Sequence, residues 1–326
     1  MGRSTIAIKQ VPSDFQVAEI LGQPLTGTGE HSYFFVEKQN LNTQDVVKRL
    51  CTAYDVERTQ VGYAGRKDKH ALTRQWFSVN EPTGQWRLAE ELKCLSIVRH
   101  SRKLRIGELA GNLFRICCRT SEPIKVCAGD LQGHFPNHFG AQRFGHSNLQ
   151  DATTWLLQRR QRRIGRAQKS WHLSVLRSFL FNEVLNYRIQ HGSFATVLDG
   201  DFAIDGLPTG PLWGRGRSPT QGLAGQLERE ALQEHHEICE ALEYAGVDQG
   251  RRPLAGKPIS LFVSTGVSHS SHRSAQVSAE PASNHGFWLS FGLSSGVYAT
   301  SLLSHHFELG QLGGDENPQE GARGEV

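Results

Sequence analysis

The sequence predicts an α+β fold in which a mainly helical segment interrupts a strand-rich region. Short apolar runs separated by turn residues dominate the first part of the chain, as is typical of strands. Helical periodicity replaces them over about 151–192 and again over 223–246. Strand texture returns from 253 to 307, so we expect the two strand-rich parts to belong to one domain.

The length of 326 residues suits two domains, or one large domain that carries an insertion. Low hydrophobicity beyond residue 308 predicts a disordered tail. The expected organisation is a first domain part at 1–150, an insert at 151–252, the last domain part at 253–308 and the tail at 309–326.

Two early elements follow from local patterns. The run SYFFVEK (32–38) is β-rich and predicts a strand. Residues 42–56 predict a helix, because their apolar residues fall on one face and Asn42 or Thr43 can cap the start.

Other segments are less regular. Residues 102–119 are expected to form a β-hairpin with Gly107 and Gly111 near its turns. The Gly- and Pro-rich stretch 199–219 is expected to be irregular. Residues 286–307 have the texture of strands.

The composition is that of an ordinary globular protein, with 38% hydrophobic and 21% charged residues. No apolar run approaches the roughly 20 residues that cross a bilayer, and the first residues lack the apolar stretch of a signal peptide. The six cysteines include no CxxC pair, which argues against a zinc site or a disulfide framework. We therefore expect a cytoplasmic protein with no membrane association.

Charge is spread unevenly along the chain. The formal net charge is +4, yet five acidic residues and a single arginine lie from Glu308 onward. The rest of the chain is therefore more basic than the total suggests, which favours an acidic partner.

The most informative motif is AGRKDKHALTRQW (64–76), in which Asp68 follows a glycine turn. Opposite charge lowers the pKa of a carboxyl group, and an ionised carboxylate among phosphate-binding cations is a candidate nucleophile or base. The alternative is a solvated turn with ordinary surface ion pairs. The cations around Asp68 are Arg66, Lys67, Lys69, His70 and Arg74.

A second motif, FPNHFGAQRFG (135–145), combines three aromatic residues, an amide and an arginine. Aromatic stacking and amide hydrogen bonds hold an extruded base in many RNA-binding sites. The alternative is an aromatic turn that packs on the core.

A basic run within 156–169 suits contact with phosphates. At 3.6 residues per turn, four of its arginines would share one helix face: Arg159, Arg162, Arg163 and Arg166. The alternative is a solvated helix face. The HSSH run (269–272) has no acidic or cysteine partner nearby in the sequence, so no metal site is expected there.

Six stretches of the chain, in order, resemble the successive motifs of the TruD family of pseudouridine synthases. The matches extend from Ile8 to about Leu303. The stretches are IKQVPSDFQVAEILG, AGRKDKHALTRQW, RKLRIGELAGNLFRI, PNHFGAQRFG, SVLRSFLFNEVL and LSFGLSSGVYATSLL.

The resemblance implies the fold of a pseudouridine synthase catalytic domain, with a mixed, largely antiparallel sheet and an inserted, mainly helical TruD-specific domain. The implied reaction converts a uridine of tRNA, pointing to uridine 13 of the D arm, into pseudouridine. As an isomerisation it needs no cofactor or metal. The implied partner is tRNA, no protein partner is expected, and the protein is expected to be a monomer.

The resemblance also implies roles for individual residues. The catalytic Asp of the family falls on Asp68, and the sequence leaves open whether it attacks C1′, adds to C6 or assists as a base. Tyr298 stands where the family pattern has Phe, and both the insert and the stretch before Asn137 are short for the family. The residues implied to bind substrate are Lys9, Phe15, Lys67, His70, Asn137, Phe139 and Tyr298.

Two other classes of function compete with this interpretation. One is a non-catalytic RNA-binding protein with the same fold, against which the intact RKDKH and NHF motifs argue. The other is a metal-dependent RNA hydrolase, which needs clustered carboxylate or histidine ligands that the sequence does not present.

Overall fold

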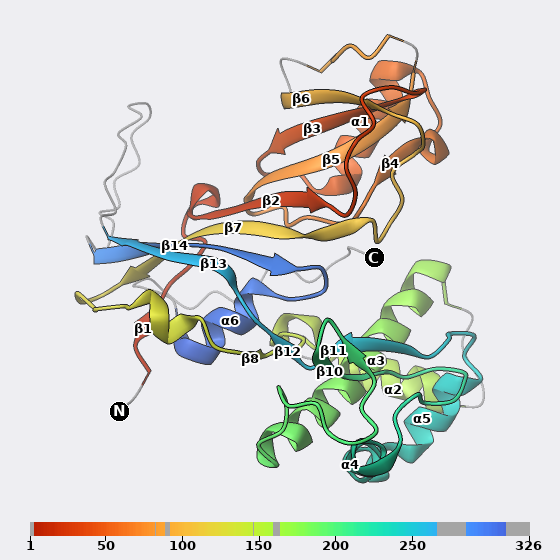
Figure 1. Cartoon of the computed structure of the whole chain (residues 1–326). Coiled ribbons are helices and arrows are strands. Elements are labelled where there is room, and N and C mark those ends of the chain that lie inside the picture. Colours follow the sequence, from red (N-terminus) through yellow and green to blue (C-terminus); the bar gives the residue numbers. More distant parts are fainter. Residues whose placement is uncertain are drawn as a thin grey trace. The chain divides into compact units, whose positions relative to one another are not determined.

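The computed structural model describes residues 3–81, 83–88, 92–145, 147–158, 164–265 and 285–310 (Figure 1). These residues form two compact units. The first unit holds the described residues of 1–132, 258–296 and 306–310, and the second holds those of 133–257 and 297–305. The insert was expected at 151–252, whereas the second unit already begins at Gly133. That this unit is the family-specific insertion stays a prediction.

The first unit is built on a mixed, eight-stranded sheet with the order β13-β14-β7-β2-β5-β3-β6, and β4 pairs with β5 (Figure 1). Its strands β2 and β5 are parallel, and the other described pairings in this sheet are antiparallel. The predicted sheet type is therefore confirmed. The strands are β2 (Phe15–Leu21), β3 (His31–Lys38), β4 (Val61–Tyr63), β5 (Leu72–Asn80), β6 (Lys93–His100), β7 (Leu109–Thr120), β13 (Ile259–Thr265) and β14 (His285–Ser294).

Helix α1 (Thr43–Tyr54) matches the helix expected at 42–56. The Asn42 side chain accepts a hydrogen bond from Asp45 N at 2.9 Å, and the Asp45 carboxylate accepts one from Asn42 N at 3.1 Å. This reciprocal cap satisfies two amides that the helix leaves open. Val46, Val47 and Leu50 are buried and pack in one cluster with residues of β3 and β5.

The hairpin predicted at 102–119 is wrong. Strand β7 runs unbroken from Leu109 to Thr120, and Gly111 lies inside it opposite Ser294. A Cβ at Gly111 would collide with the carbonyl group of Leu293, so close packing rather than a turn explains this glycine. Gly107, at a φ of +91°, does lie in the turn before β7.

The second unit is mainly helical, and its core surrounds helix α3, which buries Leu176, Leu180 and Phe181. The helices expected at 151–192 and 223–246 are present as two pairs. They are α2 (Asn148–Leu157), α3 (Arg166–Gln190), α4 (Gly222–Ala231) and α5 (His236–Glu243). Two further predictions are corrected, because 199–219 contains strands β9 and β10 and the end of 286–307 is helix α6.

The remaining elements are short. The strands are β1 (Thr5–Ile6), β8 (Phe135–Pro136), β9 (Ala203–Ile204), β10 (Leu207–Leu212), β11 (Gly250–Pro253), β12 (Ala255–Gly256) and β15 (Glu308–Leu309), and the helix is α6 (Ala299–His306). The 3-10 helices are η1 (Pro12–Asp14), η2 (Arg58–Gln60), η3 (Ala128–Leu131), η4 (Ala141–Arg143) and η5 (Gln233–His235). Among the described residues, no helix combines the length and apolar character needed to span a membrane.

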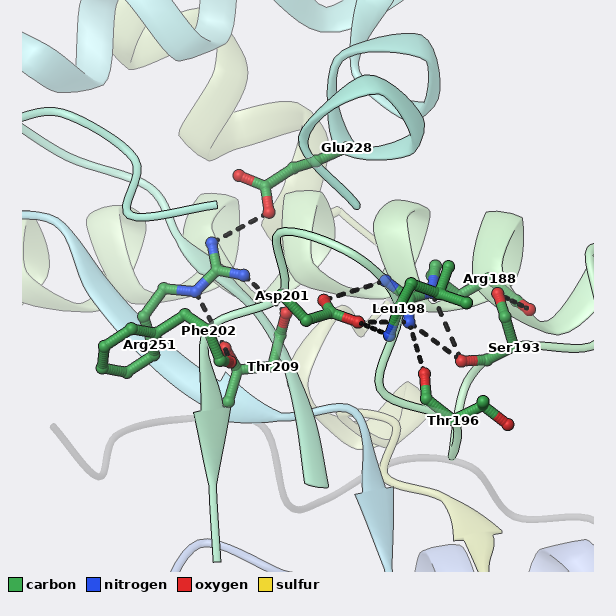
Figure 2. A network of polar contacts seen from close by, with 9 residues as sticks. All are labelled: Arg188, Ser193, Thr196, Leu198, Asp201, Phe202, Thr209, Glu228 and Arg251. Carbon is green, nitrogen blue, oxygen red and sulfur yellow. Dashed lines mark hydrogen bonds and ion pairs between the residues drawn. The ribbon is translucent and has the colours of Figure 1, made fainter. Parts of the chain in front are cut away.

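A buried polar network fixes the loop that follows α3 in the second unit (Figure 2). Arg188, near the end of α3, forms an ion pair with Asp201 at 2.9 Å, and both side chains are buried. Its guanidinium also donates to the carbonyl oxygens of Ser193 and Thr196 at 3.0 and 2.9 Å. The loop backbone is therefore closed onto the helix by one side chain.

Candidate functional site

Asp68 lies in the loop between β4 and β5, and its carboxylate is held at both oxygens. Lys9 Nζ forms an ion pair with Oδ2, and the backbone N–H of His70 donates to Oδ1 at 3.0 Å. The side chains of Lys9 and Asp68 remain 27% and 36% exposed. The carboxylate is thus oriented by the protein and still open to solvent.

Buried polar side chains fix the backbone of this loop. Thr43 Oγ1 accepts from Lys67 N at 3.0 Å and donates to Gln75 Oε1 at the same distance. Gln75 Nε2 donates to Gly65 O at 2.6 Å, and Lys38 Nζ donates to Asp68 O at 3.2 Å. The position of Asp68 therefore depends on side chains from α1, β3 and β5.

Lys9 connects Asp68 to an aromatic ring. Its ammonium nitrogen lies 4.5 Å from the centre of the Phe15 ring, a cation–π contact. Its backbone has a φ of +58°, a left-handed conformation that is uncommon outside glycine and often marks functional sites. Phe15 is only 5% exposed and meets Phe114 edge to face at 6.1 Å. Phe15 therefore supports Lys9 from the core.

Two of the cations near Asp68 in the sequence have other partners. Lys67 forms an ion pair with the buried Glu19 at 2.7 Å, and Arg74 forms one with Glu37 at 2.8 Å. His70 meets Asp68 through its backbone N–H. The described cation on the carboxylate is thus Lys9, which lies 59 positions away in the sequence.

The surroundings keep Asp68 ionised. Burial raises the pKa of this carboxyl, but the Lys9 ammonium and the N–H of His70 outweigh burial, so the pKa lies below its ordinary value. An ionised, solvent-accessible carboxylate can act as a nucleophile or as a base.

A second group of predicted residues lies in the second unit, around Asn137. This side chain is fully buried, and both ends of its amide are engaged. Nδ2 donates to Pro253 O at 3.0 Å, and Oδ1 accepts from Arg252 Nη2 at 2.7 Å. Pairing of β8 with β12 holds the chain just before Asn137 in register.

Phe139 is tied to helix α3. Asn182 accepts from Phe139 N and donates to Phe139 O, both at 2.9 Å, so its amide acts like a strand partner. The Phe139 ring meets Phe181 edge to face at 5.4 Å and lies 5.8 Å from Tyr298. Phe139 is 9% exposed, whereas Tyr298 is 38% exposed. Of the three aromatic residues implied to bind substrate, Phe15 and Phe139 are buried and only Tyr298 has an accessible ring.

Arg252 is the residue of this group that the sequence reasoning missed. It is 6% exposed, and its guanidinium carbon lies 3.9 Å from the centre of the Phe139 ring. Burial lowers the pKa of Arg252 to about 9, so the side chain stays protonated at neutral pH. The signal that could have pointed to it is a pair of arginines in the short run GRRPLAG, just before an apolar strand.

The Arg-rich run is only partly described. Arg159, Arg162 and Arg163 lie outside the described residues, and Arg166 is the first residue of α3. Ile164 and Gly165 are not helical, so one helix face does not extend through the run to Arg166 as expected.

Two further features bear on ligands. A pocket of about 380 Å³ in the second unit is lined by Phe139 and by residues of α3, β10 and the chain before β11, among them Ser174 and Arg177. Within the part of the chain that the structure describes, no three His, Cys, Asp or Glu side chains are grouped so that they could hold a metal ion. The HSSH run lies outside that part.

Comparison with known proteins gives one consistent answer. A family model described as tRNA pseudouridine synthase D (TruD) matches residues 3–163. A Methylococcus capsulatus protein named tRNA pseudouridine synthase D is 38% identical over 94% of this chain and 92% of its own. A Shewanella oneidensis protein with the same name is 35% identical over 92% of this chain and 85% of its own.

The fold also matches a solved structure. A crystal structure from Methanosarcina mazei, described as a TruD protein, superposes with a TM-score of 0.65 over 94% of both chains at 19% identity. This likeness confirms the predicted α+β fold.

Proposed function

The chain belongs to the TruD family, and from this premise we propose that it isomerises a uridine of tRNA to pseudouridine. The observation that carries the proposal is the ionised and partly exposed carboxylate of Asp68, the residue to which the family resemblance assigns catalysis. The relatives that carry the name of this activity match nearly the whole length of the chain.

The proposed reaction needs no co-reactant. The bond from C1′ to N1 breaks, a bond from C1′ to C5 forms, and the proton on C5 is exchanged for one on N1. Asp68 would serve as nucleophile at C1′, as nucleophile at C6, or as a base, and each role requires the ionised form that Lys9 favours. We propose uridine 13 of the D arm as the target.

Roles in substrate binding are proposed for the residues of each unit taken by itself. In the second unit, the accessible ring of Tyr298 would stack on the target base, supported by Phe139 and Asn137 behind it. In the first unit, Phe15, Lys67 and His70 would maintain the surroundings of Lys9 and Asp68. Phosphate contacts would come from Arg159, Arg162, Arg163 and Arg166.

The test is to convert an unmodified tRNA with the wild-type protein and to map pseudouridine by chemical labelling and primer extension. We expect product at position 13 and none from Asp68→Asn. The amide is nearly isosteric, so that variant should keep its tRNA affinity and melting temperature. A variant that retained a tenth of the wild-type rate would reject Asp68 as the nucleophile.

The same assay separates the alternatives. Tight binding of intact, unmodified tRNA by the wild-type protein would indicate a non-catalytic RNA-binding protein. Cleaved RNA would indicate a hydrolase. Pseudouridine at a position other than 13 would keep the activity and correct the target.

A further inference from the structure

Strand β11 carries two adjacent arginines whose side chains have different partners, as expected where neighbouring residues point to opposite faces. Arg251 Nη1 donates to Glu228 Oε2 at 2.9 Å, and its Nε donates to Thr209 Oγ1 at 3.0 Å (Figure 2). These contacts join β11 to α4 and β10. Arg251 is therefore part of the framework of the second unit.

Arg252 makes a different set of contacts. Its guanidinium carbon lies 3.9, 4.4 and 5.2 Å from the ring centres of Phe139, Phe181 and Tyr298. Its Nη2 donates to Asn137 Oδ1 at 2.7 Å. One planar cation thus contacts Asn137, Phe139 and Tyr298, the three residues of this unit that the sequence assigned to the substrate.

The contacts of Asn137 explain how such a cation acts. With Nδ2 on Pro253 O and Oδ1 on Arg252, the amide links the segment of Phe139 to β11 from both ends. The side-chain amide of Asn has an acceptor oxygen at one end and a donor NH2 at the other. A guanidinium can only donate, so it fixes the orientation in which the Asn137 oxygen faces Arg252. Because Asn137 is fully buried, it would not touch a substrate itself and would act by holding the segment of Phe139 against β11.

We propose that Arg252 is a positioning residue, which holds Phe139, Asn137 and the exposed ring of Tyr298 in the geometry that receives the target base. This inference rests on the proposed function. Burying a charge is costly, so apolar packing alone would not favour an arginine here. A planar donor that stacks on rings and fixes an amide is the property that Arg has and Met or Lys lacks.

The test compares Arg252→Met with Arg251→Met, a matched control one residue away. For each we would measure thermal unfolding, tRNA affinity and the single-turnover rate constant at saturating tRNA. For Arg252→Met we expect a rate at least about tenfold lower, since a misplacement of about 1 Å can cost 10²-fold. Its tRNA affinity should stay within about threefold, because phosphate contacts dominate that affinity. Its melting temperature should fall modestly, because Asn137 Oδ1 loses this donor, so its rate constant is measured below the transition.

Arg251→Met should lose stability rather than rate. It leaves Glu228 buried without this cation, so the melting temperature should fall. Below the transition, its rate constant should stay within about twofold of wild type, since Arg251 contacts none of the three positioned residues in the described structure. Equal rate losses in both variants would show that Arg252 is merely part of the framework.

A wild-type rate in Arg252→Met would overturn the inference. If Arg252→Met does not fold, Arg252→Lys decides, because lysine keeps the charge and the stem but not the planar stack. We expect Arg252→Lys to fold and to lose rate, and a wild-type rate there overturns the proposal. No pseudouridine from wild-type protein would instead reject the proposed function and this inference with it.

Discussion

Two loops of this protein use a carboxylate in opposite ways. One is the Asp68 loop, between β4 and β5 of the first unit, and the other is the loop after α3 in the second unit, here called the Arg188 loop because Arg188 of α3 anchors it. In the Arg188 loop, Asp201 itself is the anchor, completely buried against the guanidinium. In the Asp68 loop, Thr43 and Gln75 anchor the backbone, and the carboxylate stays 36% exposed. The structural carboxylate, Asp201, is enclosed by its partner. The candidate reactive carboxylate, Asp68, is positioned through its backbone and remains accessible to solvent. The following variants test this difference.

The largest effect should come from Asp201→Ala, which leaves Arg188 buried without its carboxylate. Removing one partner of a buried pair costs about 3–5 kcal/mol, so the free energy of unfolding should fall by that amount in urea titrations. The control is Asp248→Ala, whose ion pair with Arg215 at 2.8 Å is largely exposed. Exposed pairs contribute about 0–1 kcal/mol. Equal losses from both variants would contradict the structural role of Asp201.

The next effect concerns Lys9→Met and the pH dependence of the reaction. Lys9 lowers the pKa of Asp68, while burial raises it, so removing the ammonium should raise that pKa. The acid limb of the pH–rate profile should move to higher pH by about 1–3 units, the usual effect of a neighbouring opposite charge. Lys9→Arg keeps the charge and should move it less. An unchanged acid limb in Lys9→Met would mean that Asp68 does not depend on Lys9 for its ionisation.

The anchor of the Asp68 loop is tested by Thr43→Val. The change removes a hydroxyl that serves both Lys67 N and Gln75 Oε1, and an unsatisfied buried partner costs about 1–3 kcal/mol. Stability should fall by that amount, and the rate at saturating tRNA should fall because Asp68 loses its position. Thr52→Val is the control, since Thr52 bonds only to Lys48 O of its own helix among the described contacts. A stable variant with wild-type turnover would show that the loop does not need this anchor.

Much of the fold could be predicted because its signals are local. The cap at Asn42 and the apolar face of α1 lie within one short window, and both were found. The errors arose where one residue type serves two purposes. Glycine is a typical turn residue, but in the structure Gly111 allows two strands to pack closely. The short apolar run of α6 is compatible with a strand as well as with a helix.

The candidate site shows where sequence reasoning ends. Asp68 stands out because its motif is contiguous, yet its surroundings do not follow from that motif. The neighbouring Lys67 turns to Glu19, and the effective cation, Lys9, could be assigned only through the family resemblance. The contact of Arg252 with Asn137 joins positions 115 apart, and neither charge nor hydrophobic periodicity encodes such a pairing.

The smallest expected change in rate is that of Tyr298→Phe, and it tests the role of the Tyr298 ring in the second unit. If its exposed ring stacks on the base, the ring matters and the hydroxyl does not, since the family resemblance implies Phe at this position. Tyr298→Phe should therefore keep the single-turnover rate within about twofold. Tyr298→Ala should lose the stacking energy of about 1–3 kcal/mol, which corresponds to a fall in rate of roughly 5- to 150-fold. Phe139→Ala is the comparison, since Phe139 is buried beneath Arg252 and its loss should lower stability as well as rate. A large loss in Tyr298→Phe would move the role from the ring to the hydroxyl, and unchanged rates in Tyr298→Ala would remove Tyr298 from the site.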